Sequence, residues 1–125
     1  MNFEYYNPSD ESRSCVVRTL TKLTGKEYST VKAELDALAQ ELGYETYNEA
    51  AVFERYMAKH SIYKMKEYEN ITVGELELNG GSYCVYSTNQ NGFFHLIPVV
   101  DNVIYDRRND STELFVIAVY KKEKE

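Results

Sequence analysis

A cysteine at the start of a predicted helix is the residue of this sequence best placed to do chemistry. Cys15 follows Ser14, an N-cap candidate, at the head of a helix predicted over 14–24. The free amides and the dipole of a helix N-terminus favour an anion, and they lower the pKa of a thiol there. Arg18, one turn along, and Arg13 add positive charge that acts in the same direction. The position therefore predicts a reactive thiolate beside amides that can stabilise an oxyanion. The alternative is a small buried apolar side chain, the commonest fate of an isolated cysteine.

A histidine and an aspartate on neighbouring strands are the predicted partners of this thiol. His95 lies on a strand predicted over 93–100, and the next strand is predicted over 103–106. If a hairpin joins them, Ile97 pairs with Asp106, and Asp106 becomes a diagonal neighbour of His95, about 7–8 Å away at Cα. A carboxylate there would hold one ring nitrogen and leave the other for the cysteine.

Two alternatives for the carboxylate stay open. Asp110 would also lie on the right face, through pairing with Phe93, and is the second choice. Asp106 could instead be a strand-end carboxylate that faces Arg107 or Arg108.

Pro98 is the awkward residue of the first of these two strands. It cannot donate to a ladder, so it implies a bulge or an unpaired flank. A four-residue loop from Val100 to Val103 is the preferred connection, because it would turn the missing donor of Pro98 away from the following strand. A loop that differs by one residue would place Asp106 on the opposite face.

The elements that must position these side chains divide the chain into two halves. Hydrophobic spacing predicts further helices from Ser29 or Thr30 to Gly43 and from Asn48 to about His60, and Thr72 opens a short turn. Alternating residues then predict strands over 82–87, 93–100, 103–106 and 113–121. We therefore expect one α+β domain over 1–125, with N-terminal helices (about 12–77) packed on a C-terminal antiparallel β-sheet meander (about 82–121).

Composition excludes several classes of function. The 125 residues are 43% hydrophobic and 27% charged, which is typical of one globular domain. The net charge of −6 argues against binding to nucleic acid or an anionic membrane, since both need a basic patch. Met1–Asp10 carries no apolar signal core, so we expect a cytoplasmic protein with reduced cysteines. Cys84 is expected in the core and His60 at the surface, and we expect neither a metal nor a cofactor.

Several stretches resemble the small papain-like cysteine peptidase domains of phages and bacterial mobile elements. The segments at 14–20 (SCVVRTL) and 23–31 (LTGKEYSTV) are similar to the opening of these domains, which show a Cys-Val-x-Arg segment and a Thr-Gly-Lys-x-Tyr turn. The segments at 80–85 (GGSYCV) and 94–106 (FHLIPVVDNVIYD) are similar to their second half. There a strand leads to the catalytic histidine, and a hairpin ends in Tyr-Asp. The resemblance covers about residues 10–120.

The resemblance implies a papain-like fold and a Cys-His-Asp site. Cys15 would be the nucleophile, His95 the general base and then acid, and Asp106 the orienting carboxylate. Attack on an amide or thioester carbonyl of a peptide or protein substrate would give an acyl-enzyme that water resolves.

The sequence also departs from the family pattern. The related peptidases place Gln six residues before the nucleophile to complete the oxyanion hole, whereas this chain has Ser9. Asn7 is a nearby amide that could replace it, and Gln90 lies in a loop that could approach. They also place Asp just before the cysteine, where this chain has Ser14. The alternative function is therefore a catalytically inactive papain-like interaction protein of phage or mobile-element origin that binds a host protein.

Overall fold

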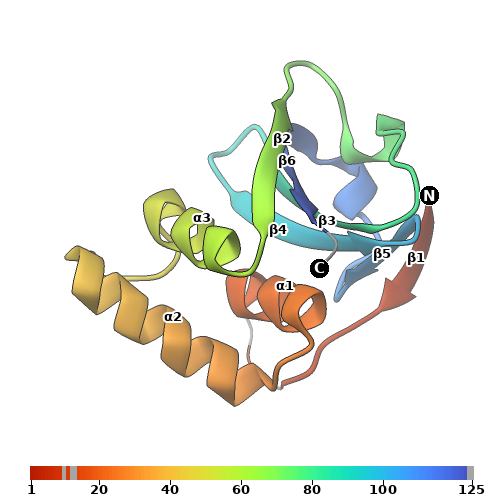
Figure 1. The fold of residues 1–125 in the computed structure, drawn as a ribbon. Helices are drawn as coiled ribbons and strands as arrows, with labels where there is room; N and C mark the ends of the chain where they lie inside the picture. The colour runs from red at the N-terminus through yellow and green to blue at the C-terminus, as the bar shows by residue number, and fades with distance from the viewer. Residues whose placement is uncertain (10, 12–13, 124–125) are drawn as a thin grey trace.

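The protein is described by a computed structural model that covers residues 1–9, 11 and 14–123, so Arg13 lies outside the described residues. It is an α+β fold of three helices and a six-stranded sheet (Figure 1). The helices are α1 (Cys15–Thr24), α2 (Tyr28–Leu42) and α3 (Ala50–Lys59). The strands are β1 (Asn2–Tyr5), β2 (Ile62–Glu67), β3 (Ser82–Thr88), β4 (Phe94–Val100), β5 (Val103–Asp106) and β6 (Phe115–Lys122).

The helices end where the sequence predicts, because glycines close two of them. Gly25 after α1 and Gly43 after α2 adopt left-handed backbone angles, φ 74° and φ 84°, and their amides cap carbonyls of the last turn. The starts are less exact: α2 begins at Tyr28 and α3 follows Glu49, not Asn48. Ser14 is the N-cap of α1, as predicted, although its side chain makes no cap hydrogen bond.

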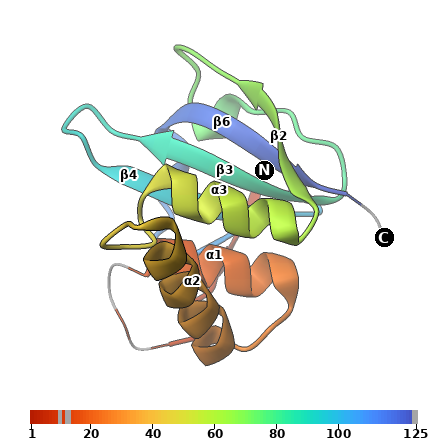
Figure 2. The ribbon, with the colours of Figure 1, turned by 60° about the vertical axis from the view of Figure 1, so that its left-hand side comes forward.

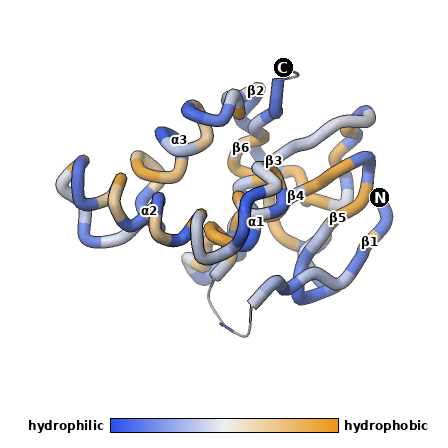
Figure 3. The backbone as a smooth tube through the Cα atoms, turned by 60° about the horizontal axis from the view of Figure 1, so that its bottom comes forward, coloured by the Kyte–Doolittle hydropathy of each residue, from blue (hydrophilic) through white to orange (hydrophobic). Residues whose placement is uncertain are grey.

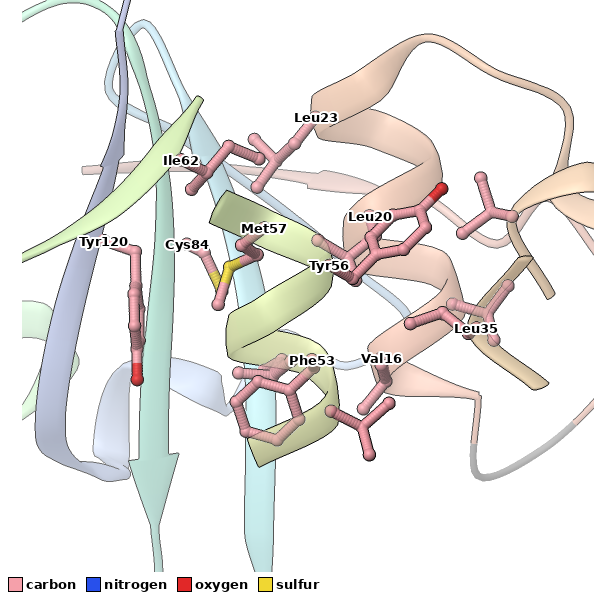
Figure 4. Packing of buried hydrophobic residues seen from close by; sticks show 14 of the residues in the cluster. Val16, Leu20, Leu23, Leu35, Phe53, Tyr56, Met57, Ile62, Cys84 and Tyr120 are labelled. Atoms are coloured by element: carbon pink, nitrogen blue, oxygen red, sulfur yellow. The ribbon is translucent and has the colours of Figure 1, made fainter. Parts of the chain in front are cut away.

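The molecule is layered. Helices α1 and α3 lie against one face of the sheet, and α2 packs on the outside of both (Figure 2). Between helices and sheet lies a core that includes Leu20, Phe53, Met57, Cys84 and Tyr120 (Figure 4). The tube coloured by hydropathy is largely orange along β4, a central strand of the sheet (Figure 3).

The other face of the sheet is covered without a long helix. A second core lies there, and it joins sheet residues such as Val85, Ile97 and Ile104 to Val73 and Leu76 from the segment after β2. That segment carries the predicted turn as a 3-10 helix, η1 (Val73–Glu75), and a second 3-10 helix, η2 (Ser111–Glu113), precedes β6. The central strands are therefore buried on both faces.

The simple meander is wrong in its strand order. The sheet order is β1-β5-β4-β3-β6-β2, so β6 pairs with β3 and not with β5, and β1 makes the sheet mixed by running parallel to β5. β3 is largely buried and takes a partner along each edge, which explains why β6 crosses over. β1 and β2 are strands outside the predicted sheet half of 82–121.

The hairpin between β4 and β5 has the predicted register but not the preferred loop. Val100 pairs with Val103 and Val99 with Ile104. The loop consists of Asp101 and Asn102, with φ 50° and 65°, the two left-handed residues of a type I′ turn, and not of four residues. The described ladder ends at the Val99–Ile104 pair, so Pro98 has an unpaired flank toward β5, one of the two predicted outcomes.

Candidate functional site

The site begins where β5 parts from β4. Beyond the end of their ladder, the free edge of β4 is occupied by side chains of α1. Thr19 Oγ1 donates to the carbonyl of Leu96 at 3.0 Å, and the amide of Leu96 lies close enough to Cys15 to lower the pKa of its thiol. The first turn of α1 thereby replaces a strand at this edge and holds the Cys15 sulfur beside β4.

His95, the residue before Leu96, lies between Cys15 and Asp106. Its Nε2 is 2.8 Å from Asp106 Oδ2, and it lies close enough to Cys15 for each of these two side chains to shift the pKa of the other. Because Asp106 takes Nε2, Nδ1 is the ring nitrogen left for the sulfur. The structure therefore brings Cys15, His95 and Asp106 together in the order that the sequence predicts.

Asp106 is the centre of a buried hydrogen-bond network. Only 1% of it is exposed, and its Oδ1 accepts from Arg18 Nη2 at 3.1 Å and from the amide of Arg107 at 2.7 Å. Its Oδ2 accepts from Ser111 Oγ as well as from the imidazole. Four donors on one carboxylate fix its orientation and favour its charged form.

The two alternatives for this carboxylate do not describe the structure. Asp110 is the ion-pair partner of Arg108 and faces solvent, whereas Asp106 accepts from His95. Arg107 contributes its amide to Asp106, and the guanidinium that binds Asp106 belongs to Arg18.

Arg18 joins the head of α1 to this network. It is 2% exposed, and its Nη1 donates to Ser14 Oγ at 3.3 Å while its Nη2 holds Asp106. Its Nε is buried with no partner among the residues that the structure describes. A single buried guanidinium thus links the start of the helix to the end of β5.

The pKa values of the thiol and the imidazole move in opposite directions. Burial acts against the Cys15 thiolate, but the hydrogen bond and charge of His95, the amide of Leu96 and the charge of Arg18 outweigh it and lower the pKa. Burial also acts against the charged form of His95, but Asp106 and Cys15 raise its pKa to about 9. The pKa of Asp106 is lowered, because His95, Ser111 and the amide of Arg107 outweigh burial.

A pocket opens beside the imidazole. It has a volume of about 350 Å³ and is lined by His95 and by residues of the loops that flank it, among them Phe93, Asp110, Glu113 and Leu114. The ring of Phe93 is stacked on that of His95, with centroids 5.6 Å apart and an interplanar angle of 25°.

Arg18 is one of four predicted oxyanion or supporting residues, and the other three lie outside the hydrogen-bond network of Asp106. Ser9 Oγ accepts from the amide of Glu11 in the segment before α1. Asn7 is half-buried, and its Oδ1 has no partner within the described part of the chain. Gln90 is exposed in the turn between β3 and β4.

Ser111, Phe93 and the edge of β4 at Leu96 were not predicted from the sequence. Ser111 begins the three-residue 3-10 helix η2, which is too short for a hydrophobic period to place its side chains. Phe93 is two residues from His95, and alternation could have suggested a shared face. Cys84 is fully buried, as predicted, and its pKa is raised by burial. His60 is half-buried against the ring of Tyr56 and not simply at the surface.

Comparisons with protein-family models, curated proteins and solved structures found no match for this chain. Within residues 1–9, 11 and 14–123, no three His, Cys, Asp or Glu side chains form a group that could hold a metal ion. None of the helices in the same part of the chain has the length and apolar character to cross a bilayer.

Proposed function

We propose that this protein is a papain-like cysteine hydrolase that cleaves peptide or isopeptide bonds through an acyl-enzyme. The observation that carries the proposal is the contact of one buried imidazole with both a thiol and a carboxylate. Cys15 is the nucleophile, His95 the general base and acid, and Asp106 the orienting carboxylate.

The pKa shifts favour an ion pair in the resting enzyme. The pKa of Cys15 lies below its ordinary value of 9.0 and that of His95 is about 9, so the proton of the pair resides on His95. The thiolate at the head of α1 is then the attacking species, and the imidazolium is already the acid that the leaving group needs.

Each proton and electron pair has a place in the resulting reaction. The Cys15 thiolate attacks the substrate carbonyl carbon, a C–S bond forms, and the carbonyl oxygen takes the negative charge. The C–N bond then breaks as His95 gives its proton to the leaving amine. Water, deprotonated by His95, attacks the thioester, and the thiolate leaves as the acid product forms.

Backbone amides are the first candidates to stabilise the oxyanion. The amide of Arg18 makes the first helical hydrogen bond, to the carbonyl of Ser14 at 2.8 Å, so the amide of Cys15 lies ahead of the helical ladder. The side-chain amide of Asn7 is the second candidate, in the role that Gln has in the related peptidases.

Selective labelling tests the proposed nucleophile. Iodoacetamide near pH 7 should alkylate Cys15 at least about ten-fold faster than a free thiol in a peptide, because a lowered pKa keeps more of it as thiolate. Mass spectrometry should find the label on Cys15 and not on Cys84. A rate equal to that of the peptide thiol would refute an activated nucleophile.

Hydrolysis tests the reaction itself. The folded protein should cleave members of a fluorogenic peptide and isopeptide mixture, and Cys15→Ala should abolish the cleavage, whereas Cys84→Ala should preserve the labelling of Cys15. Cleavage by Cys15→Ala as fast as by the wild type would assign the activity to a contaminant or to another residue.

A non-catalytic interaction protein on the same fold is the second candidate. The exposure of Gln90 and the position of Ser9 favour it, because neither supplies the amide that the related peptidases use. The edge strand β1 also presents Phe3 and Tyr5 to solvent, 39% and 66% exposed. Full biological effect of a Cys15→Ala variant would support this candidate against the hydrolase.

A further inference from the structure

The pocket described above adjoins His95, the residue that protonates the leaving group in the proposed reaction. Its lining includes His95 but not Cys15. During acyl transfer the sulfur bonds to the acyl carbon, whereas the imidazole protonates the leaving nitrogen. A cavity that adjoins the imidazole and not the sulfur therefore receives the part of the substrate that departs with that nitrogen.

The walls of this pocket combine apolar and acidic surface. Phe93 and Leu114 provide apolar surface, and Phe93 is held in place because its amide donates to Asn89 Oδ1 at 3.0 Å. Two carboxylates, Asp110 and Glu113, also line the pocket.

Within the part of the chain that the structure describes, one of the two carboxylates in the lining has no ion-pair partner. The one cation in the lining besides the imidazole is Arg108, and it pairs with Asp110. This leaves the exposed Glu113 with no ion-pair partner among the described residues. A side chain with an apolar stem and a cationic head matches these walls, because the stem can pack on the aromatic ring while the head reaches a carboxylate.

We infer that this pocket is the leaving-group subsite and that it selects a lysine or arginine side chain on the amine side of the scissile bond. The inference rests on the proposed function, and it adds a substrate class to it. In reverse, an amine that occupies the pocket attacks the thioester on Cys15, transfers its proton to His95 and releases the thiolate, so amines can compete with water for the acyl-enzyme.

That competition is the test. The protein is acylated with a p-nitrophenyl ester at pH 8, and lysinamide or norleucinamide is added as the competing amine. The two amines have side chains of similar length, and only that of lysinamide carries a charge at this pH. The ratio of aminolysis to hydrolysis should be about five-fold higher with lysinamide, as for a favourable exposed ion pair.

Matched variants locate the source of the preference. Glu113→Gln should bring the lysinamide and norleucinamide ratios close together, whereas Glu41→Gln, an equal charge change on the exposed end of α2, should leave the preference intact. Asp110→Asn removes the ion-pair partner of Arg108. The unpaired guanidinium should repel the lysine side chain, so the ratio of aminolysis to hydrolysis with lysinamide should fall below its wild-type value.

The possible failures are distinguishable. An acyl-enzyme that reacts equally well with both amines, or better with norleucinamide, would overturn the subsite while leaving the hydrolase intact. If no p-nitrophenol burst appears and no acyl group is found on Cys15, the proposed function fails and the subsite fails with it.

Discussion

Among the groups that lower the pKa of the Cys15 thiol, His95 has the largest effect. Burial raises the pKa of the thiol, and the imidazole is the first of the groups that lower it. In His95→Ala the burial remains, so the pKa should rise, and alkylation at pH 7 should slow by about ten-fold or more.

The pH dependence of iodoacetamide alkylation, followed on Cys15 by mass spectrometry, checks this prediction. In the wild type the thiolate should persist as the pH falls below 9.0, the ordinary value of a thiol. His60→Ala is the matched control, since His60 bonds the carbonyl of Tyr56 and should leave the profile unchanged. An unaltered profile in His95→Ala would contradict the ion pair.

Asp106 and Asp110 both bind an arginine, yet they should differ greatly in their effect on stability. Asp106→Asn leaves the buried Arg18 without its counter-charge and should lower the free energy of unfolding by about 3–5 kcal/mol. Asp110→Asn breaks a pair whose side chains are 70% and 42% exposed and should cost less than about 1 kcal/mol. Urea denaturation at pH 7 measures both.

The same carboxylate gives stability a definite pH dependence. Because the pKa of Asp106 is lowered from 3.8, its contribution is fully present above pH 3.8 and is lost as the pH falls through the lower folded value. The difference in stability between the wild type and Asp106→Asn should therefore shrink only in acid. A constant difference down to pH 2 would contradict an ionised Asp106.

At the scale of elements, the docking of α1 on β4 should depend on one hydroxyl. Thr19→Val removes the donor to the buried carbonyl of Leu96 and should destabilise the fold by about 1–3 kcal/mol. It should also lower the alkylation rate of Cys15, because the sulfur is held by the same residue of β4.

Thr24→Val provides the control for this prediction. The Thr24 hydroxyl donates to the carbonyl of Leu20 within α1 itself, so its loss leaves the docking of the helix unchanged. Equal effects of the two variants, in urea denaturation and in labelling, would show that the Thr19 hydroxyl has no special part in the docking.

At the scale of the whole molecule, Cys84 reports on whether the helices and the sheet unfold together. It is fully buried in the core between them. In a Cys15→Ala background, labelling of Cys84 should appear at the same urea concentration as the loss of helical circular dichroism. Labelling at a clearly lower concentration would show that the helices detach first.

The features that could be predicted from the sequence are those fixed by residues close together in the chain. The meeting of His95 and Asp106 was accessible because a turn sequence and strand alternation fix the register of one hairpin. The position of β6 beside β3 could not be predicted, because strand order depends on packing between segments that are far apart in the sequence. The edge strands β1 and β2 are exposed at almost every position, so no buried alternation marks them.

Pro98 in β4 explains why β4 and β5 separate near His95. Leu96 turns its amide toward Cys15 and its carbonyl toward Thr19, and strand alternation points the nitrogen of Pro98 to the same edge. That nitrogen carries no hydrogen, so Pro98 cannot donate the hydrogen bond that would extend the ladder between β4 and β5. The two strands therefore stay apart beyond Val99. The first turns of α1, which carry Cys15 and Thr19, occupy the edge of β4 that β5 leaves unpaired.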